Sequence, residues 1–207
     1  MFVRATTITA DPTRLDAGIA YVRDTVVPAV AAIPGNHGLS MIADRNTGTA
    51  TVTTAWDTVE ARADSDAALA PHRAKLVEAM GASRAVVELL ELAVLDRMRP
   101  AQSGFWTRQT RVTIDPSRLE GAIDAYSSSV LHDIQLLAGY CSAVLLVDRE
   151  NGHGAISVVF DSRDSLEASR GHADRVRAAG LAKAGATLVE VREAELVIAG
   201  LRVPQSG

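Results

Sequence analysis

The sequence predicts an α+β protein in which one module is written twice, over residues 1–96 and 105–203. The halves come into register when one is shifted by 104 residues, which places residues 11–15 (Asp-Pro-Thr-Arg-Leu) over residues 115–119 (Asp-Pro-Ser-Arg-Leu). Both halves carry an apolar stripe at helical spacing, followed by two short β-rich runs joined by a turn. Independent domains would not agree by chance at so many turn and cap positions.

Each module begins with a strand, over 2–9 in the first copy and 105–113 in the second. The next element is a helix, because Asp11 and Asp115 can each cap a helix whose first turn opens with proline. Its inward stripe consists of Leu15, Ile19, Val22, Val26, Val30 and Ile33, and in the second copy of Leu119, Ile123, Tyr126, Val130, Ile134 and Leu137.

Two strands follow the helix, near 37–43 and 49–56 in the first copy. In the second copy the pair Asn151-Gly152 is a strong hairpin signal at the matching place. A second helical region over about 58–80 comes next, and we expect it to break before Pro71 because proline disrupts a helix interior.

The last strands are predicted over 86–95 and 188–198, with 97–104 as a linker. The order βαββαβ is the ferredoxin-like arrangement, a four-stranded antiparallel sheet with two helices on one face. Segments 89–95 and 143–147 are apolar on both faces, so the helix-free face of each sheet needs cover. We therefore expect the two sheets to pack face to face.

Composition narrows the classes of function. Net charge is −4, which gives no general attraction to nucleic acid or to an anionic membrane. Cys141 is the single cysteine, so an internal disulfide and a cysteine-rich metal site are excluded. No tract is long and apolar enough to span a bilayer, and the N-terminus lacks the layout of a secretory signal. We expect a cytoplasmic protein.

Residues 56–60 (Trp-Asp-Thr-Val-Glu) end a strand and lead into the second helical region, which carries His72, and residues 160–164 (Phe-Asp-Ser-Arg-Asp) lead into the helix with His172. In these features the chain resembles the dimeric α+β barrel superfamily, and within it the antibiotic biosynthesis monooxygenase-like group. The resemblance covers nearly the whole chain twice and implies a fused pseudo-dimeric barrel. That superfamily includes cofactor-independent oxygenases of aromatic compounds, haem-degrading enzymes and isomerases, so the fold alone implies little about the reaction.

His72 and His172 are the candidate catalytic residues, because a histidine at either position could move the substrate proton in an oxygenase-like reaction. Haem-degrading relatives also carry an iron-binding histidine on this helical region. Those relatives add a tryptophan and a first-strand asparagine. In this chain the tryptophan position falls near Ser65 and Ser169, and the first strands contain no asparagine. Haem breakdown is therefore disfavoured, haem binding stays open, and we expect no cofactor and no metal. The competing interpretation makes both histidines surface or helix-start residues.

Arg4 and Arg108 repeat in the middle of the first strands and are candidate ligand-binding residues. An arginine there could hold an anionic substrate or a developing enolate through paired N–H donors. The alternative is an ion pair with a glutamate of the neighbouring last strand. The glutamates on those strands are Glu88, Glu91, Glu190 and Glu193.

Three aromatic residues, Trp56, Trp106 and Phe160, could line a cavity for an aromatic ligand. Bulky side chains at strand positions more often form plain core, and that interpretation stands beside the first.

The resemblance and the repeated arginines favour a cofactor-independent monooxygenase-like protein that acts on a small aromatic or polyketide-like molecule. The alternative is a non-catalytic barrel that holds a small apolar ligand, as a binding or stress-associated protein. In either case we expect a small apolar or aromatic partner molecule, no nucleic acid, no membrane, and a monomeric pseudo-dimer or a homodimer. Different residues at paired positions, such as Trp56 and Phe160, allow one copy alone to hold a working site.

Overall fold

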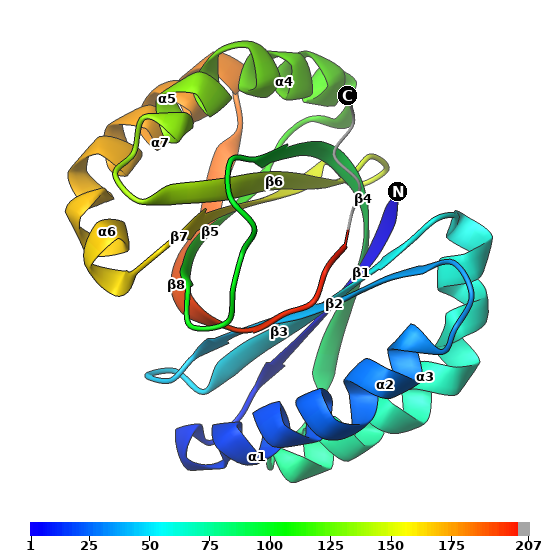
Figure 1. Ribbon diagram of the computed structural model, residues 1–207. Helices are drawn as coiled ribbons and strands as arrows, with labels where there is room; N and C mark the ends of the chain where they lie inside the picture. The colour runs from blue at the N-terminus through cyan, green and yellow to red at the C-terminus, as the bar shows by residue number, and fades with distance from the viewer. Residues whose placement is uncertain (203–207) are drawn as a thin grey trace. The chain divides into compact units, whose positions relative to one another are not determined.

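The computed structural model describes residues 1–202, and the predicted βαββαβ order is confirmed in both halves (Figure 1). Val203, the last residue of the predicted second module, lies outside the described residues. The elements of the first half are β1 (Phe2–Thr9), η1 (Pro12–Arg14), α1 (Leu15–Tyr21), η2 (Val22–Val26), α2 (Val27–Ala31), β2 (Asn36–Asp44), β3 (Thr49–Trp56), α3 (Val59–Ala79) and β4 (Ala85–Arg97).

The second half repeats this order with one helix divided. Its elements are β5 (Trp106–Thr113), η3 (Pro116–Arg118), α4 (Leu119–Ala125), η4 (Tyr126–Val130), α5 (Leu131–Gln135), β6 (Tyr140–Asp148), β7 (His153–Phe160), α6 (Arg163–Ala168), α7 (Arg170–Ala184) and β8 (Thr187–Ala199). The segments η1 and η3 are 3₁₀ turns, whereas η2 and η4 are π-helical and fall at matching positions in the two halves.

The caps predicted from sequence are present. The side chain of Asp11 accepts a hydrogen bond from the backbone N–H of Thr13 at 2.9 Å, and Asp115 accepts one from Ser117 at 2.9 Å. Each cap therefore satisfies a backbone donor that the first turn leaves free. The π-helical turn that follows α1 and α4 widens the helix locally and re-aims the side chains that it carries.

The expected break before Pro71 is wrong. Helix α3 runs without interruption past Pro71, and the break lies in the second half, where Ser169 separates α6 from α7. A proline inside a helix costs about 3 kcal/mol. Leu69 and Leu76, on either side of Pro71, are both buried, and burial of a leucine contributes roughly 1.5–3 kcal/mol each. Packing of α3 thus offsets the lost backbone bond.

By its internal contacts the described part of the chain divides into two compact units, which we call the first unit (Met1–Leu90 with residues 194–202) and the second unit (Glu91–Glu193). Both divisions fall inside a long last strand, so β4 begins in the first unit and ends in the second, while β8 does the reverse. The boundaries predicted for the sequence modules, and their origin by duplication, stay predictions.

In the first unit β1 pairs with β3, β3 with β2, and β2 with the end of β8, all antiparallel. In the second unit β5 pairs with β7, β7 with β6, and β6 with the end of β4 in the same way. The complete strand order is β1-β3-β2-β8-β5-β7-β6-β4, which is that of a closed barrel. The predicted α+β class and antiparallel barrel topology are confirmed.

The hairpin turns end at a glycine that no other residue could replace without strain. Gly152 has φ +66°, and a Cβ there would lie 2.0 Å from the carbonyl oxygen of Ile114. That close approach lets the N–H of Ile114 donate to the carbonyl oxygen of Gly152 at 2.8 Å. Gly48 repeats the arrangement against Ala10, so the hairpin signal of the sequence corresponds to a tether between the turn and the end of the first strand.

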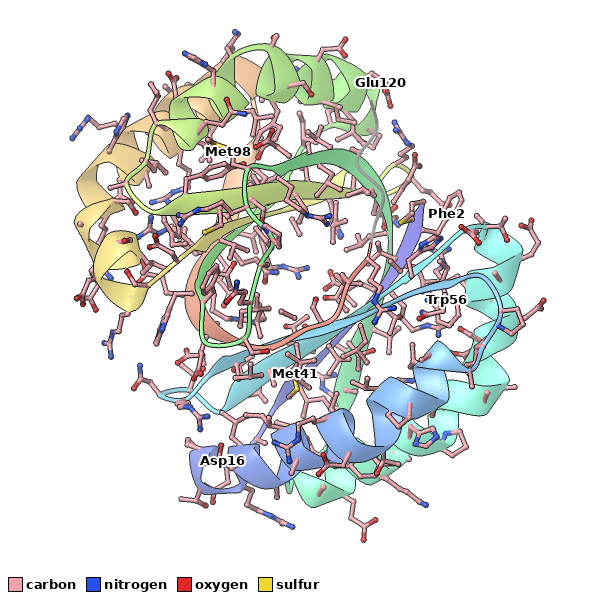
Figure 2. The ribbon with its side chains drawn as sticks, in the orientation of Figure 1. Phe2, Asp16, Met41, Trp56, Met98 and Glu120 are labelled. Atoms are coloured by element: carbon pink, nitrogen blue, oxygen red, sulfur yellow. The ribbon has the colours of Figure 1, made fainter. Side chains whose placement is uncertain are left out.

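Each unit has its own core between helices and sheet. Trp56 and Met80 are fully buried in the first unit, and Phe160 and Leu166 are buried in the second. Figure 2 shows the side chains filling these interiors. Among the described helices, none combines the length and the apolar character needed to cross a bilayer.

Candidate functional site

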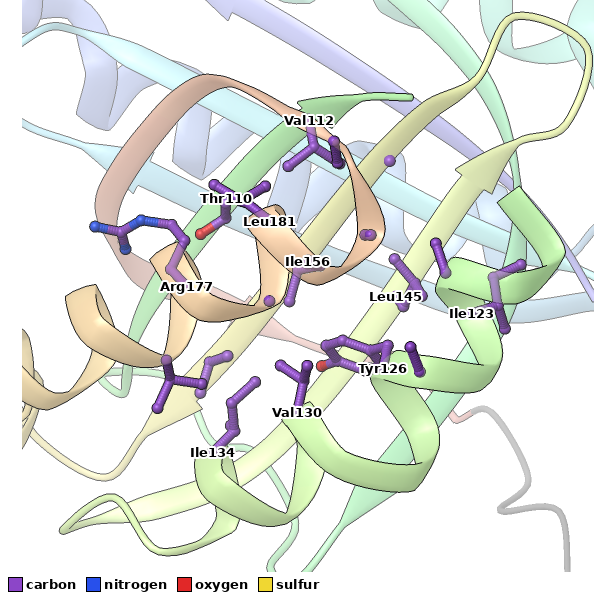
Figure 3. Close-up of a pocket in the computed structure, with 18 of the residues that line it drawn as sticks. Thr110, Val112, Ile123, Tyr126, Val130, Ile134, Leu145, Ile156, Arg177 and Leu181 are labelled. Atoms are coloured by element: carbon purple, nitrogen blue, oxygen red, sulfur yellow. The ribbon is translucent and has the colours of Figure 1, made fainter. Parts of the chain in front are cut away.

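The second unit contains a cavity of about 120 Å³ between its helices and its sheet (Figure 3). Helices α4, α5 and α7 form one wall, and strands β5, β6 and β7 form the other. Among the described residues its lining is apolar except for Arg108, Thr110, Tyr126 and Arg177. The size is on the order of that of an engineered apolar cavity of about 150 Å³, which stays dry and binds benzene. A ring-sized apolar molecule therefore fits this space.

The cavity exists because α7 carries small residues where α3 carries large ones. At the shift of 104, Ala173 stands at the place of Leu69, Gly180 at that of Leu76, and Ala184 at that of Met80. The three large residues are buried in the first unit, where the corresponding cavity measures only about 40 Å³. The smaller space touches Arg4, Thr54 and His72.

Arg108 is one of the residues that line the larger cavity and is 4% exposed. Its Nε and Nη2 donate to Glu193 Oε1 at 3.0 and 2.8 Å, Nη1 donates to Ser169 Oγ at 2.9 Å, and Nη2 also donates to the carbonyl oxygen of Leu166 at 2.7 Å. The guanidinium carbon lies 5.5 Å from the centre of the Phe160 ring. Guanidinium has five N–H donors, so one is left for a ligand.

Arg4 repeats part of this arrangement in the first unit. Its Nη1 donates to Ser65 Oγ at 2.8 Å and its Nη2 to the carbonyl oxygen of Arg62 at 2.6 Å. Its acidic partner is Asp66 on α3, 3.3 Å away and half exposed, and its buried Nε lacks a partner among the described residues. Burial lowers the pKa of Arg4, with Asp66 opposing that shift.

The predicted arginine–glutamate ion pair is thus confirmed for Arg108 with Glu193, whereas Arg4 pairs with the helix residue Asp66. Ser65 and Ser169 have a structural role that the sequence alone does not predict. Both lie near the position of the haem-binding tryptophan of the haem-degrading relatives, and in the structure both are buried hydrogen-bond acceptors for the strand arginine.

Tyr126 lies on η4, and its ring forms part of the cavity wall (Figure 3). The residue is 5% exposed, and its hydroxyl is buried without a hydrogen-bond partner among the described residues. Burial raises the pKa of this hydroxyl, and the negative charge of Asp96 adds to the shift. Tyr126 therefore stays a neutral O–H group at neutral pH.

Asp96 is held beside this hydroxyl by a second tyrosine. The Tyr140 hydroxyl donates to Asp96 Oδ2 at 2.6 Å, and burial, followed by this bond, raises the pKa of Tyr140. The three residues form a polar group at an otherwise apolar interior. At the corresponding positions the first unit has Val22 and Asn36, so the group belongs to the second unit alone.

The two predicted catalytic histidines have different settings. His72 touches the smaller cavity, and its Nδ1 lies 2.9 Å from the Tyr21 hydroxyl. His172 is exposed on α7 and is absent from the lining of either cavity described above. Within residues 1–202, no group of three or more potential metal-ligating side chains comes together. The catalytic role of both histidines stays a prediction.

The three predicted aromatic residues also differ. Phe160 is fully buried and lines the larger cavity. Trp56 is fully buried in the first core, and its indole N–H donates to Thr54 Oγ1 at 3.1 Å. Trp106 is partly buried and faces Arg163, whose guanidinium carbon lies 5.1 Å from the ring centre. The structure therefore brings Arg108 and Phe160 together at one cavity, along with Tyr126, which sequence reasoning placed only in an apolar stripe.

Comparison with known proteins identifies relatives along the whole chain. Uncharacterized protein Rv2557 of Mycobacterium tuberculosis H37Rv is 38% identical over 205 residues, covering 99% of this chain and 91% of that protein. Uncharacterized protein Rv2558 of the same strain is 39% identical over 206 residues, covering 99% and 87%. The chain belongs to the family of Rv2557 and Rv2558. No family model matches it.

Solved structures similar to this member of the Rv2557 family share its fold at low sequence identity. An anthrone oxidase-like protein has a TM-score of 0.70 and 15% identity, with 99% of this chain and 96% of that chain covered. A Listeria monocytogenes ferredoxin-fold protein related to antibiotic biosynthesis monooxygenases has a TM-score of 0.54 and 8% identity, with 94% of each chain covered. A haem-degrading enzyme from the same species gives 0.54 and 9%, covering 95% and 99%. The fold is therefore that of the antibiotic biosynthesis monooxygenase-like proteins.

Proposed function

We propose that this chain is a cofactor-independent monooxygenase-like protein that takes a small aromatic or polyketide-like molecule into the cavity of the second unit. The observation that carries this proposal is the apolar, ring-sized cavity with Arg108 and Tyr126 in its wall. The likeness to an anthrone oxidase-like protein supports a ring compound as ligand.

Such a reaction needs no external reductant. When a ring methylene becomes a carbonyl, O₂ supplies one oxygen atom to the product, and the other oxygen leaves as water with the two hydrogens of the methylene. The carbon gives up four electrons, and O₂ accepts all four. The walls would exclude water, and the remaining N–H of Arg108 would stabilise negative charge that develops on a ring oxygen.

One observation favours a second function, non-catalytic binding of a small ligand. Among residues 1–202, those that line the larger cavity include no histidine and no carboxylate, so the described part of its wall holds no such proton acceptor. Four protein hydrogen bonds already hold Arg108. A binding or stress-associated barrel would need no more than this apolar space.

Oxygen uptake with 2-indanone, a small aromatic ketone with an activated ring methylene, separates the two functions. The wild-type chain and Gly180→Leu, which fills the cavity as Leu76 does in the first unit, are compared for 2-indanone binding by calorimetry and for O₂ consumption with an electrode, without added metal or cofactor. The monooxygenase-like function predicts binding and uptake of one O₂ per 2-indanone above the protein-free rate in the wild type only. Binding without extra uptake supports the second function, and equal binding by both chains contradicts the cavity as the site.

Native mass spectrometry of the untagged protein complements this test. A mass above that of the apo chain would reveal a co-purified ligand or haem, and the spectrum would distinguish a monomeric pseudo-dimer from a homodimer. A cytoplasmic location is part of the same proposal, and fractionation of the producing cells tests it.

A further inference from the structure

The Tyr126 hydroxyl is buried in the second unit and makes no hydrogen bond to the described residues. Only 5% of the Tyr126 surface is exposed. Burial of a hydroxyl without a partner costs about 1–3 kcal/mol, and a phenylalanine of the same shape would avoid this cost. In the first unit the same π-helical position holds Val22, so the fold itself does not require a polar side chain there.

The surroundings of Tyr126 indicate which kind of atom would complement the hydroxyl. The ring lines the cavity, and Val130 and Ile134, which line the same cavity and are labelled with Tyr126 in Figure 3, are apolar. A water molecule needs two to four polar partners, which such a wall supplies poorly. The carboxylate of Asp96 is close enough to act on the Tyr126 hydroxyl, so an anionic ligand atom there would be repelled. A neutral acceptor, such as a ring ketone, satisfies the O–H without that repulsion.

We propose that Tyr126 is the specificity-determining residue of the cavity and donates a hydrogen bond to a neutral carbonyl oxygen on an aromatic ligand. This assignment rests on the proposed ligand-binding function and narrows it to aromatic ketones and related carbonyl compounds. Glu193 and Asp174 already pair with Arg108 and Arg177, so neither arginine has an unbalanced positive charge that would select a ligand that is anionic before any reaction.

A matched pair of probes tests the assignment. Acetophenone and α-methylstyrene have nearly the same shape, but only acetophenone has a carbonyl oxygen where the other has a methylene carbon. Their dissociation constants are measured by calorimetry for the wild type, Tyr126→Phe and Gly180→Leu. The ratio of the two constants is compared between chains, because each probe's own tendency to leave water cancels in that comparison.

We expect the preference for acetophenone to be about tenfold greater in the wild type than in Tyr126→Phe, with α-methylstyrene binding alike to both. Equal ratios in the two chains, with binding lost in Gly180→Leu, would overturn the role of Tyr126 and leave the cavity as the binding site. Failure of both probes to bind the wild type more tightly than Gly180→Leu would contradict the proposed function instead.

Discussion

The interiors of the two units share the same order of secondary-structure elements but differ in the size of the side chains that fill them. Both have a strand arginine bonded to a buried serine, which is Ser65 in α3 of the first unit and Ser169 between α6 and α7 of the second, and both have a π-helical turn after the first helix. In the first unit the side chains of Leu69 and Leu76 fill the space under α3, while in the second Ala173 and Gly180 leave it open. The difference shows how a cavity can arise by loss of side-chain volume without a change of fold.

The two units also differ in how completely the strand arginine is hydrogen-bonded. Arg108 is held by four hydrogen bonds, two of them to its ion-pair partner Glu193, whereas Arg4 has two hydrogen bonds, a half-exposed acidic partner and a buried Nε without a partner among the described residues. The unit with the open cavity therefore has the better satisfied arginine. This pattern is expected where the arginine must stay in place while a ligand comes and goes.

Among the variants considered, Arg108→Met should cause the largest change in the free energy of unfolding. Removing one partner of a buried ion pair typically costs 3–5 kcal/mol, and we expect about 3 kcal/mol because Glu193 keeps Arg170 at 2.5 Å. Arg4→Met, the matched control, should cost about 1–2 kcal/mol, since fewer bonds are lost and the unpartnered Nε goes with them. Urea unfolding measures both. Equal losses would mean that the two arginines do not differ as their contacts suggest.

Gly180→Leu should raise the free energy of unfolding, by less than Arg108→Met lowers it. The new side chain enters the cavity, and a Cβ at this position lies 3.3 Å from Val130 Cγ2, so a small adjustment of Val130 suffices. Filling the space and removing a helical glycine should stabilise the chain by roughly 1–3 kcal/mol.

Two controls separate the contributions at Gly180. Gly180→Ala changes the backbone propensity and adds only one methyl group to the cavity, while Ala179→Leu adds the same side chain on the exposed face of α7. Thermal and urea unfolding should rank Gly180→Leu above both. A destabilised Gly180→Leu would show that the second unit cannot close as the first does.

The fold could be predicted from sequence because its signals are local and occur twice. The caps at Asp11 and Asp115 and the glycine of each hairpin turn fix where elements begin and end. The break at Pro71 was mistaken because burial of α3, a tertiary effect, outweighed a local preference. The passage of β4 and β8 from one unit to the other depends on long-range pairing, which propensity does not report.

The site was predictable only in part. Arg108 and Phe160 stood out because their positions repeat, but their partners Ser169 and Glu193 become evident only in three dimensions. Tyr126 was visible as a tyrosine in an apolar stripe, opposite Val22 in the first copy. The signal was a polar tip at an inward position, and its meaning required the structure, because only burial shows that the hydroxyl lacks a partner.

Tyr126→Phe should have a small effect on stability in the absence of ligand. Removal of an unsatisfied buried hydroxyl leaves the apolar contacts of the ring intact, so we expect no loss and a gain of up to about 1 kcal/mol. Tyr140→Phe is the contrasting variant, because it removes the 2.6 Å bond to Asp96 and should destabilise the chain by about 1–2 kcal/mol. Were Tyr126→Phe the more damaging of the two in urea unfolding, its hydroxyl would have a partner in solution.

The smallest expected difference is in stability at alkaline pH, between the wild type and Tyr126→Phe. Burial raises the pKa of Tyr126 in the folded chain, so the folded state keeps this proton where an unfolded tyrosine, with a pKa near about 10, loses it. Stability from this group is therefore complete below about pH 10 and falls as pH rises, by up to about 1.4 kcal/mol per pH unit. Tyr140 and Tyr21, whose pKa values are also raised by burial, remain in Tyr126→Phe as a common background. The variant should lose stability less steeply than the wild type between about pH 9.5 and 11 in urea unfolding. Parallel curves would show that Tyr126 titrates as an exposed tyrosine does, which would remove the clearest distinction between the two interiors.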